Sequence, residues 1–273
     1  MNSCRVALIQ LNSRDNKKEN LSKISKWTAK AMRDHPDIIV LPEQASYCSD
    51  TDEVANAEPL DGLTISTFQT LAQKYQVYFH CGSFLEKIEG EDRCYNTSVL
   101  LSPTGEILAQ YRKIHLFDMC IPGKVEAMES KQIKPGTKVV TVDLPIGHFG
   151  FSICYDIRFP ELYRALMEQG SKAVFVPAAF ALHTGKDHWE ALLKARAIEN
   201  QMYVIAPAQI GPYPSHEKMT YGRSMVIDPW GTVIAVASDD EGYIIADLQW
   251  DRVEKIRLDS PCLKHRVKFL RNT

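Results

Sequence analysis

Short apolar segments alternate with longer segments of helical character along this chain of 273 residues, and this alternation restricts the possible folds. The apolar segments read as strands because they are brief and rich in β-branched and aromatic residues. The expected strands are residues 4–12, 37–44, 77–84, 148–154, 172–180 and 202–210, and the expected helices are residues 16–32, 64–75, 160–170 and 187–200. Pro160 and Gly170 stand where proline opens a helix and glycine follows its end. The pattern predicts an α/β fold with helices covering a sheet.

Two further segments read as β-hairpins. Residues 96–111 and 223–238 each place a Pro-x-Gly turn between two apolar strands, which indicates two sheets in similar roles. The length alone allows one large domain or two of ordinary size. Because no linker or low-complexity stretch divides the chain, we expect residues 1–273 to form a single domain that contains both sheets.

The composition excludes several classes of protein. The net charge of −2 offers no attraction to nucleic acid or to an anionic membrane, so neither is an expected partner. The N-terminal apolar stretch is too short for a signal peptide, and no segment is long enough to span a membrane, which favours a cytoplasmic protein. The seven cysteines are an odd number without a CxxC pair, which is typical of reduced thiols. We therefore expect no metal site.

Three reactive side chains come at the ends of apolar strands. Glu43, in the segment LPEQ, comes at the end of the strand expected at residues 37–44. Lys113 follows the second strand of the first hairpin, and Cys154 lies where a strand turns into a helix. The carboxyl ends of parallel strands converge on one crevice, so these groups could meet. A cysteine needs a nearby base or cation to act as a nucleophile, and the set contains both. The competing interpretation is a surface ion pair and a buried, inert cysteine.

The segments LPEQ, YRKIHLFD and GFSICYDIRFPELYR resemble, in the same order, the three signatures of the nitrilase or carbon-nitrogen hydrolase superfamily. The similarity runs over nearly the whole chain, from Arg5 to about Arg266. The resemblance implies a four-layer α-β-β-α sandwich that pairs through its helices into an eight-layer homodimer or a larger homo-oligomer. It also implies an enzyme that needs no cofactor.

The resemblance implies a role for each reactive residue. Cys154 would be the nucleophile, Glu43 the general base, and Lys113 the cation beside the developing oxyanion. The backbone N–H of Tyr155 would be the second donor to that oxygen, and Glu129 would orient the lysine or the substrate. A preorganised donor of this kind typically supplies about 2.7–4 kcal/mol of transition-state stabilisation. The alternative interpretation of Glu129 is a solvated loop charge.

The loop AAFALHTGKDHWE is expected to supply the walls of the substrate pocket, with Phe180 and His183 as the substrate contacts. Arg158 and Glu161 are close enough in sequence to form an ion pair that shapes the loop after the cysteine. Arg196 is expected to anchor its helix to that loop. His115, His183 or His188 could replace the glutamate as the base in a Cys–His arrangement. The favoured roles are instead a hydrogen-bonded loop residue for His115 and packing at a helix start for His188.

The run after the cysteine, YDIRFPE, resembles the amidase branch called Nit rather than true nitrilases. The hypothesis is an amidase that hydrolyses a small, carboxylate-bearing amide to acid and ammonia through a thioester on Cys154. Omega-amidases and deaminated glutathione amidases both belong to this branch, and segments of the chain resemble each. The alternatives are a hydrolase of N-carbamoyl amides, and a non-catalytic interaction protein or redox sensor on the same scaffold.

Overall fold

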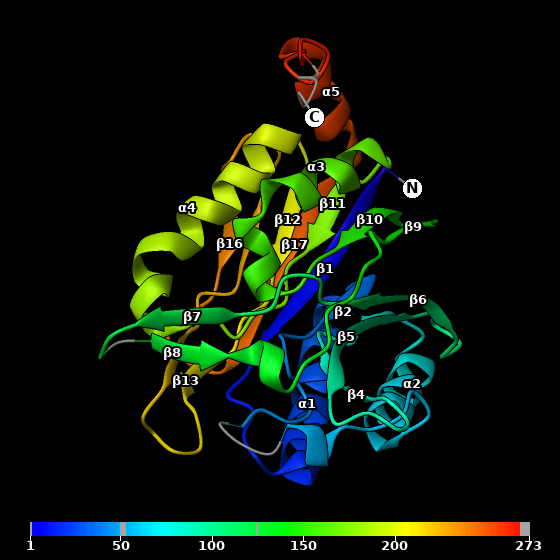
Figure 1. The fold of residues 1–273 in the computed structure, drawn as a ribbon. Helices are drawn as coiled ribbons and strands as arrows, with labels where there is room; N and C mark the ends of the chain where they lie inside the picture. The colour runs from blue at the N-terminus through cyan, green and yellow to red at the C-terminus, as the bar shows by residue number, and fades with distance from the viewer. Residues whose placement is uncertain (1, 50–52, 124, 268–273) are drawn as a thin grey trace.

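Two β-sheets stack face to face in the computed structural model, which describes residues 2–49, 53–123 and 125–267 (Figure 1). The first sheet has the order β17 (Gly242–Gln249), β1 (Ser3–Gln10), β2 (Ile38–Val40), β3 (Tyr78–His80), β5 (Cys94–Leu101) and β4 (Phe84–Lys87), and β6 (Ile107–Arg112) also pairs with β5. The second has the order β16 (Val233–Val236), β15 (Met225–Ile227), β12 (Tyr203–Ala206), β11 (Ala173–Phe175), β10 (Gly147–Phe151) and β9 (Thr141–Leu144).

Helices and two small hairpins complete the described fold. The α-helices are α1 (Lys17–Ala31), α2 (Leu63–Tyr75), α3 (Pro160–Glu168), α4 (Leu182–Asn200) and α5 (Trp250–Asp259). The short 3-10 helices are η1 (Met32–Asp34), η2 (Val54–Asn56), η3 (Glu129–Lys131) and η4 (Cys154–Arg158). The two-stranded sheets pair β7 (Asp118–Ile121) with β8 (Val125–Met128), and β13 (Ile210–Pro212) with β14 (Met219–Tyr221). Both hairpins expected from the sequence are confirmed, as β5–β6 and β15–β16.

Parallel strands form the centre of each sheet. Strands β1, β2 and β3 run in parallel in the first sheet, and β10, β11 and β12 do so in the second. Parallel strands need crossover connections, which the helices between them supply. The carboxyl ends of each set therefore lie at one edge of its sheet, and the loops that follow them come together there.

The alternation of side chains along β1 explains how one strand contributes to two apolar layers. Val6 and Leu8 face the second sheet and join a core that includes residues from both sheets, whereas Ala7 and Ile9 face α1 and α2. On the far side, α3 packs against β10 and α4 against β12. The described elements thus form the expected four-layer α-β-β-α sandwich (Figure 1).

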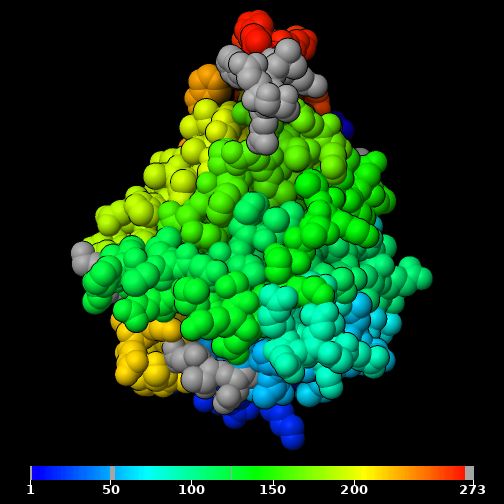
Figure 2. All heavy atoms as spheres, viewed as in Figure 1, coloured from blue at the N-terminus to red at the C-terminus, as the bar shows by residue number. Residues whose placement is uncertain are grey.

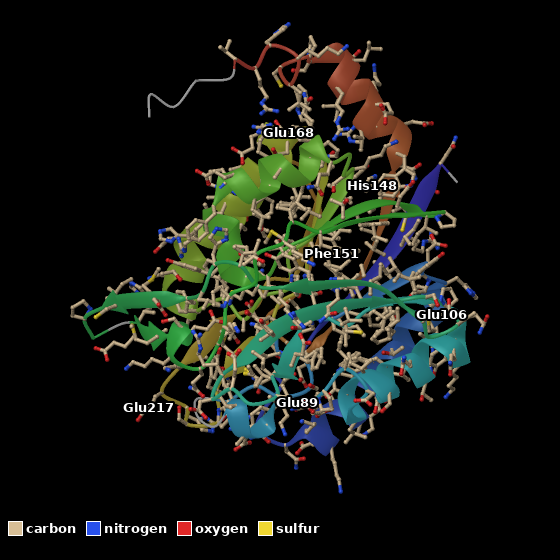
Figure 3. The ribbon with its side chains drawn as sticks, turned by 45° about the vertical axis from the view of Figure 1, so that its right-hand side comes forward. Glu89, Glu106, His148, Phe151, Glu168 and Glu217 are labelled. Atoms are coloured by element: carbon tan, nitrogen blue, oxygen red, sulfur yellow. The ribbon has the colours of Figure 1, made fainter. Side chains whose placement is uncertain are left out.

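Aromatic rings fill the space between the sheets. Phe151 and Phe175 lie directly across from each other on β10 and β11 of the second sheet, and His80 of β3 packs against both rings from the first sheet. Phe151 lies in the interior of the molecule, whereas Glu106 and Glu217 lie at its periphery (Figure 3). The imidazole of His80 is fully buried, which has consequences for acid stability.

The helix that contains His183 begins earlier than the sequence predicts. Helix α4 starts at Leu182, so the segment expected to be a loop ahead of residue 187 is helical. Gly185 lies inside this first part, where a Cβ atom would come within 2.4 Å of the Cβ of Tyr221. Glycine disfavours helices intrinsically, but here the close approach of β14 selects it. Tertiary packing therefore overrides local propensity at this helix start.

The C-terminal elements β17 and α5 were not expected from the sequence. Strand β17 pairs with β1 along its whole length, from Ser3 opposite Gln249 to Gln10 opposite Gly242. The indole of Trp250 then enters the core and donates to the backbone oxygen of Ile146 at 3.0 Å. Helix α5 stands at one end of the molecule, far from the β7–β8 hairpin (Figures 1 and 2). None of the helices described is long and apolar enough to cross a membrane.

Candidate active site

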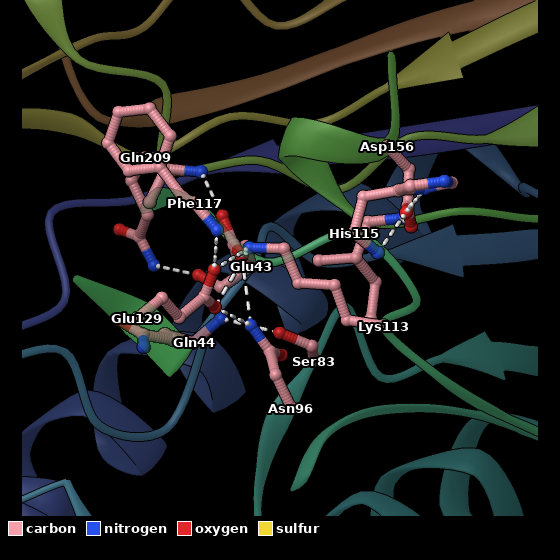
Figure 4. Close-up of polar contacts among 12 residues, drawn as sticks. Glu43, Gln44, Ser83, Asn96, Lys113, His115, Phe117, Glu129, Asp156 and Gln209 are labelled. Atoms are coloured by element: carbon pink, nitrogen blue, oxygen red, sulfur yellow. Dashed lines mark hydrogen bonds and ion pairs between the residues drawn. The ribbon is translucent and has the colours of Figure 1, made fainter. Parts of the chain in front are cut away.

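The three reactive residues singled out from the sequence lie together at the seam between the two sheets. Glu43 follows β2 and Lys113 follows β6 in the first sheet, whereas Cys154 follows β10 of the second. The ammonium of Lys113 donates to Oε1 of Glu43 at 2.9 Å (Figure 4), and the Cys154 thiol lies close enough to the same carboxylate for the two groups to interact. Exposed fractions of 4%, 2% and 8% for Glu43, Lys113 and Cys154 place all three in the interior.

Cys154 has a strained backbone conformation. Its φ of 46° lies in the left-handed region, which is uncommon for a residue with a Cβ atom and costs about 1–2 kcal/mol. The Cys154 N–H is held by the backbone oxygen of Pro177 at 2.9 Å. Burial raises the pKa of the thiol well above its usual range; the charge of Glu43 raises it further, and Lys113 opposes the shift. The resting group is therefore a neutral thiol beside a carboxylate.

Both carboxylate oxygens of Glu43 are held by hydrogen-bond donors. Oε1 accepts from Lys113 and from the amide of Asn96, each at 2.9 Å, and Oε2 accepts from the backbone N–H of Ala179 at 2.8 Å. The backbone oxygen of Glu43 accepts from the side chain of Gln209 at 2.9 Å. These hydrogen bonds restrict the rotation of the carboxylate. A group that moves a proton along a defined path needs such a fixed orientation.

Lys113 lies between two carboxylates. Its Nζ donates to both oxygens of Glu129 at 2.9 Å as well as to Glu43. Burial alone would lower the pKa of Lys113, but the charges of Glu129 and Glu43 outweigh burial and hold the pKa well above its usual range. Glu129 also accepts from the backbone N–H of Phe117 at 2.6 Å. Lys113 is therefore a fixed positive charge, and Glu129 is its half-buried partner rather than a solvated loop residue.

Asp156 connects the loop that carries Lys113 to the corner that carries Cys154. Its Oδ1 accepts from the ring and the backbone N–H of His115, at 2.7 and 3.0 Å, and its Oδ2 accepts from Tyr111 and from the backbone of Ile153 at 2.6 and 2.8 Å. The ring of His115 also stacks on Phe159 at 3.7 Å between centroids. His115 is thus the hydrogen-bonded loop residue that its sequence position suggested.

Arg158 does not pair with Glu161, contrary to the sequence-based expectation. A helix that starts at Pro160 turns Glu161 away, so Arg158 packs over the rings of Tyr155 and Phe180, with its guanidinium carbon 5.7 and 5.3 Å from their centroids. Its Nη1 lies 3.4 Å from a ring nitrogen of His188, and its Nε is buried without a partner among the described residues. The contacts of this guanidinium in the described part of the chain are with aromatic rings and with His188, and they include no ion pair with a carboxylate.

Phe180 and His183, the expected substrate contacts, lie near the start of α4, and Arg196, the expected helix anchor, lies further along that helix. Phe180 is buried and packs on Trp189 at 5.0 Å between ring centroids, whereas His183 is half-buried in the first turn of α4. Arg196 donates through Nε to the backbone oxygen of Ile157 at 2.8 Å, which confirms that it anchors α4 to the loop after the cysteine.

Two polar residues of the site were not identified from the sequence. Asn96 lies within β5, where its side chain reads as one more position of a strand. Glu53 accepts from the side chain of Gln44 at 2.9 Å; burial raises its pKa to about 7, and this hydrogen bond opposes the shift. Knowledge of the register between β5 and β6 would have identified Asn96, because the backbone oxygen of Asn96 accepts from the backbone N–H of Lys113. Across the described residues, no three His, Cys, Asp or Glu side chains are grouped to hold a metal ion.

Comparisons with known proteins agree on one family. The family profile described as carbon-nitrogen hydrolase matches residues 5–258. The protein named deaminated glutathione amidase from Synechocystis sp. is 42% identical over 266 residues, which cover 96% of this chain and 97% of that relative.

Two solved structures share the fold. The crystal structure of the Caenorhabditis elegans NitFhit protein superposes with a TM-score of 0.92 at 35% identity; the match covers 97% of this chain but spans only 65% of that longer one. Saccharomyces cerevisiae Nit3, described as a member of branch 10 of the nitrilase superfamily, superposes with a TM-score of 0.86 at 31% identity and covers 100% of this chain and 97% of its own.

Proposed function

The chain belongs to the carbon-nitrogen hydrolase family and is an enzyme that acts on amides, and from this premise we propose that it hydrolyses a small, carboxylate-bearing amide through a thioester on Cys154. The observation that carries the proposal is the position of Glu43. Its buried carboxylate accepts from the ammonium of Lys113 and interacts with the thiol of Cys154. A thiol with a raised pKa needs such a base within reach.

In the first step, the sulfur of Cys154 attacks the amide carbonyl carbon while the thiol proton passes to Glu43. The carbonyl oxygen gains the negative charge, and the fixed ammonium of Lys113 stabilises it, together with the backbone N–H of Tyr155. Stabilisation by such preorganised donors is strongest where water is excluded, as it is here. Glu129 keeps the ammonium in place through its two 2.9 Å contacts.

In the second step, the tetrahedral intermediate collapses and the C–N bond breaks. Glu43 returns its proton to the leaving nitrogen, which departs as a neutral amine or as ammonia and leaves the acyl group on the sulfur. Glu43 then accepts a proton from a water molecule that attacks the thioester, and Cys154 regains a proton as the acid is released. One carboxylate thus serves as base and acid in both halves of the reaction.

The substrate class is proposed from Arg158. Its guanidinium has a buried, unpartnered Nε and lies over Tyr155 and Phe180, close to the corner that begins with Cys154. A planar cation without a carboxylate partner of its own suits a carboxylate group on the substrate. Deaminated glutathione, the compound in the name of the Synechocystis relative, is a small amide of this class. Phe180 and His183 remain the proposed walls of the pocket.

Intact-protein mass spectrometry tests the mechanism. The protein is exposed to deaminated glutathione, alpha-ketoglutaramate and simple primary amides, and we expect an added acyl mass that proteolysis assigns to Cys154. Cys154→Ala should lose turnover and the adduct, whereas the matched control Cys4→Ala, at a fully buried cysteine of β1, should keep both. Full turnover by folded Cys154→Ala would remove the proposal.

The same panel separates the alternatives. Release of carbon dioxide together with ammonia would identify a hydrolase of N-carbamoyl amides. A peroxide-dependent sulfenate on Cys154, with no acyl mass from any amide, would instead favour a redox sensor. Absence of both products and adducts would leave a binding protein on this scaffold.

A further inference from the structure

Asn96 places an amide at the centre of the candidate active site. It lies on β5, and its backbone oxygen accepts from the backbone N–H of Lys113 at 2.9 Å, so the two residues are neighbours across the β5–β6 pair. The side chain of Asn96 is fully buried. The register of two strands therefore brings this amide beside the ammonium of Lys113 and the two carboxylates that the ammonium contacts (Figure 4).

The two ends of the Asn96 side chain have different surroundings. Its Nδ2 lies 2.9 Å from Oε1 of Glu43 and 3.4 Å from Oε1 of Glu129. Its Oδ1 is buried and has no hydrogen-bond partner among the described residues. The orientation follows from the neighbours, because the reverse orientation would turn the amide oxygen toward two carboxylates. The amide thus gives both of its contacts to charged groups of the site.

A buried asparagine with a structural role has a different pattern of contacts. Asn20 donates to the backbone oxygens of Arg14 and Ser46 at 2.6 and 3.0 Å, and its Oδ1 accepts from the backbone N–H of Arg14 at 3.1 Å. That side chain satisfies backbone groups and leaves no end unpaired. Asn96 makes no side-chain contact to the backbone of the described residues, so the fold alone does not account for its amide.

We propose that Asn96 is a positioning residue that holds Glu43 in the orientation needed to exchange a proton with Cys154, and this inference rests on the proposed function. Lys113 and Asn96 both occupy Oε1 of Glu43. The remaining oxygen, Oε2, accepts from the backbone N–H of Ala179 at 2.8 Å. The amide of Asn96 therefore restricts the rotation of the carboxylate beside the thiol of Cys154.

The charges around Glu43 explain why a neutral donor is needed. The positive charge of Lys113 faces two carboxylates, Glu43 and Glu129, and Glu53 is a third acid nearby. The thiol of Cys154 and the hydroxyl of Tyr213 are two further titratable groups that interact with Glu43. The N–H groups of Asn96 separate two like charges without adding an ion, whereas a carboxylate at this position would add to their repulsion.

Replacement of Asn96, with a matched change elsewhere, tests the proposal. Asn96→Ala removes the donor, and Asn96→Asp keeps the size but replaces the donor with an acceptor. The control is Asn200→Ala, because Asn200 is also fully buried, donates through Nδ2 to two oxygens, of Arg196 and Glu199, and has an unpartnered Oδ1 among the described residues, but lies at the end of α4. Each variant is measured for kcat and KM, and for the rate at which iodoacetamide alkylates Cys154.

We expect Asn96→Ala to lower kcat by about 100-fold while KM changes by less than about threefold, because the base is misplaced but the pocket walls are intact. Alkylation of Cys154 should slow as well, and Asn200→Ala should change neither quantity. If Asn96→Ala does not fold, the isosteric Asn96→Asp carries the test. A folded Asn96 variant with the kcat and the alkylation rate of the parent overturns the proposal, as do equal losses in the Asn200 control. Alkylation needs no substrate, so it reports on Asn96 even if the proposed function fails.

Discussion

Acidification should destabilise the protein through one imidazole in the core between the sheets. His80 is fully buried, stacks on Phe151 and Phe175, accepts through Nδ1 from the N–H of Gly82 at 3.2 Å, and contacts the hydroxyl of Ser98 through Nε2 at 2.9 Å. Burial lowers the pKa of His80 to about 3 from its usual 6.5. The folded state therefore keeps the imidazole neutral at pH values where the unfolded chain is protonated.

The sign and the size of the effect follow from proton linkage. Between pH 6.5 and about 3 the unfolded chain binds one more proton at His80 than the folded chain does, so the free energy of unfolding falls as the pH falls. A pH of 5 lies about 1.5 pH units below the usual pKa of histidine, and each unit lowers the free energy of unfolding by about 1.36 kcal/mol. His80 therefore lowers the free energy of unfolding by about 2 kcal/mol at pH 5.

Urea unfolding at pH 7 and pH 5 measures this loss. His80→Asn removes the titrating group, and although it lowers stability at both pH values, it should reduce the loss between them by about 2 kcal/mol relative to the parent. The control is His35→Asn, at an exposed histidine whose φ of 51° asparagine tolerates, and it should keep the parent's dependence on pH. Equal losses in the parent and His80→Asn would refute the reasoning.

Three more changes test the fold and the assembly. Asp156→Asn should lower the free energy of unfolding in urea by about 1–3 kcal/mol. The buried carboxylate accepts hydrogen bonds from groups such as Tyr111 and the backbone of Ile153, and an amide N–H would face one of these donors. Gly82→Ala should lower the free energy of unfolding by more than about 2 kcal/mol and should also reduce kcat. A Cβ at this φ of 63° would lie 1.9 Å from the backbone oxygen of Pro42, the residue before Glu43. A melting curve like that of the parent would contradict this. Sedimentation should show a homodimer that Trp230→Asp dissociates, because Trp230 and Ile198 are 62% and 51% exposed and apolar; a monomeric parent would contradict the expected dimer.

The sequence contained enough information to predict the layers and the neighbourhood of the three reactive residues. Glu43, Lys113 and Cys154 each follow an apolar strand, which places them at strand ends. The sequence did not show that these strands belong to two sheets, and the stacking of the sheets brings Cys154 to the other two residues. The family resemblance supplied the proposed roles, which spacing alone could not. The match to the family now shows the class of enzyme, whereas the roles of the individual residues stay proposals.

The details that escaped prediction depend on contacts between distant segments. Asn96 enters the site because β5 and β6 pair in one register, and a sequence does not state a register. The early start of α4 depends on the contact between Gly185 and Tyr221. Arg158 was assigned to Glu161 because the two are close in sequence, but proximity along a turn says little about the direction of each side chain once a helix begins at Pro160.

The position of the site at the seam means that neither sheet holds it alone. The carboxylate and the ammonium come from one sheet and the sulfur from the other, and the two sheets are held together by side-chain packing such as that of His80 on Phe151 and Phe175. The catalytic rate should therefore depend strongly on the position of one sheet relative to the other. A core substitution that shifts one layer by a fraction of an ångström would silence the enzyme while its circular dichroism spectrum still reported a native protein.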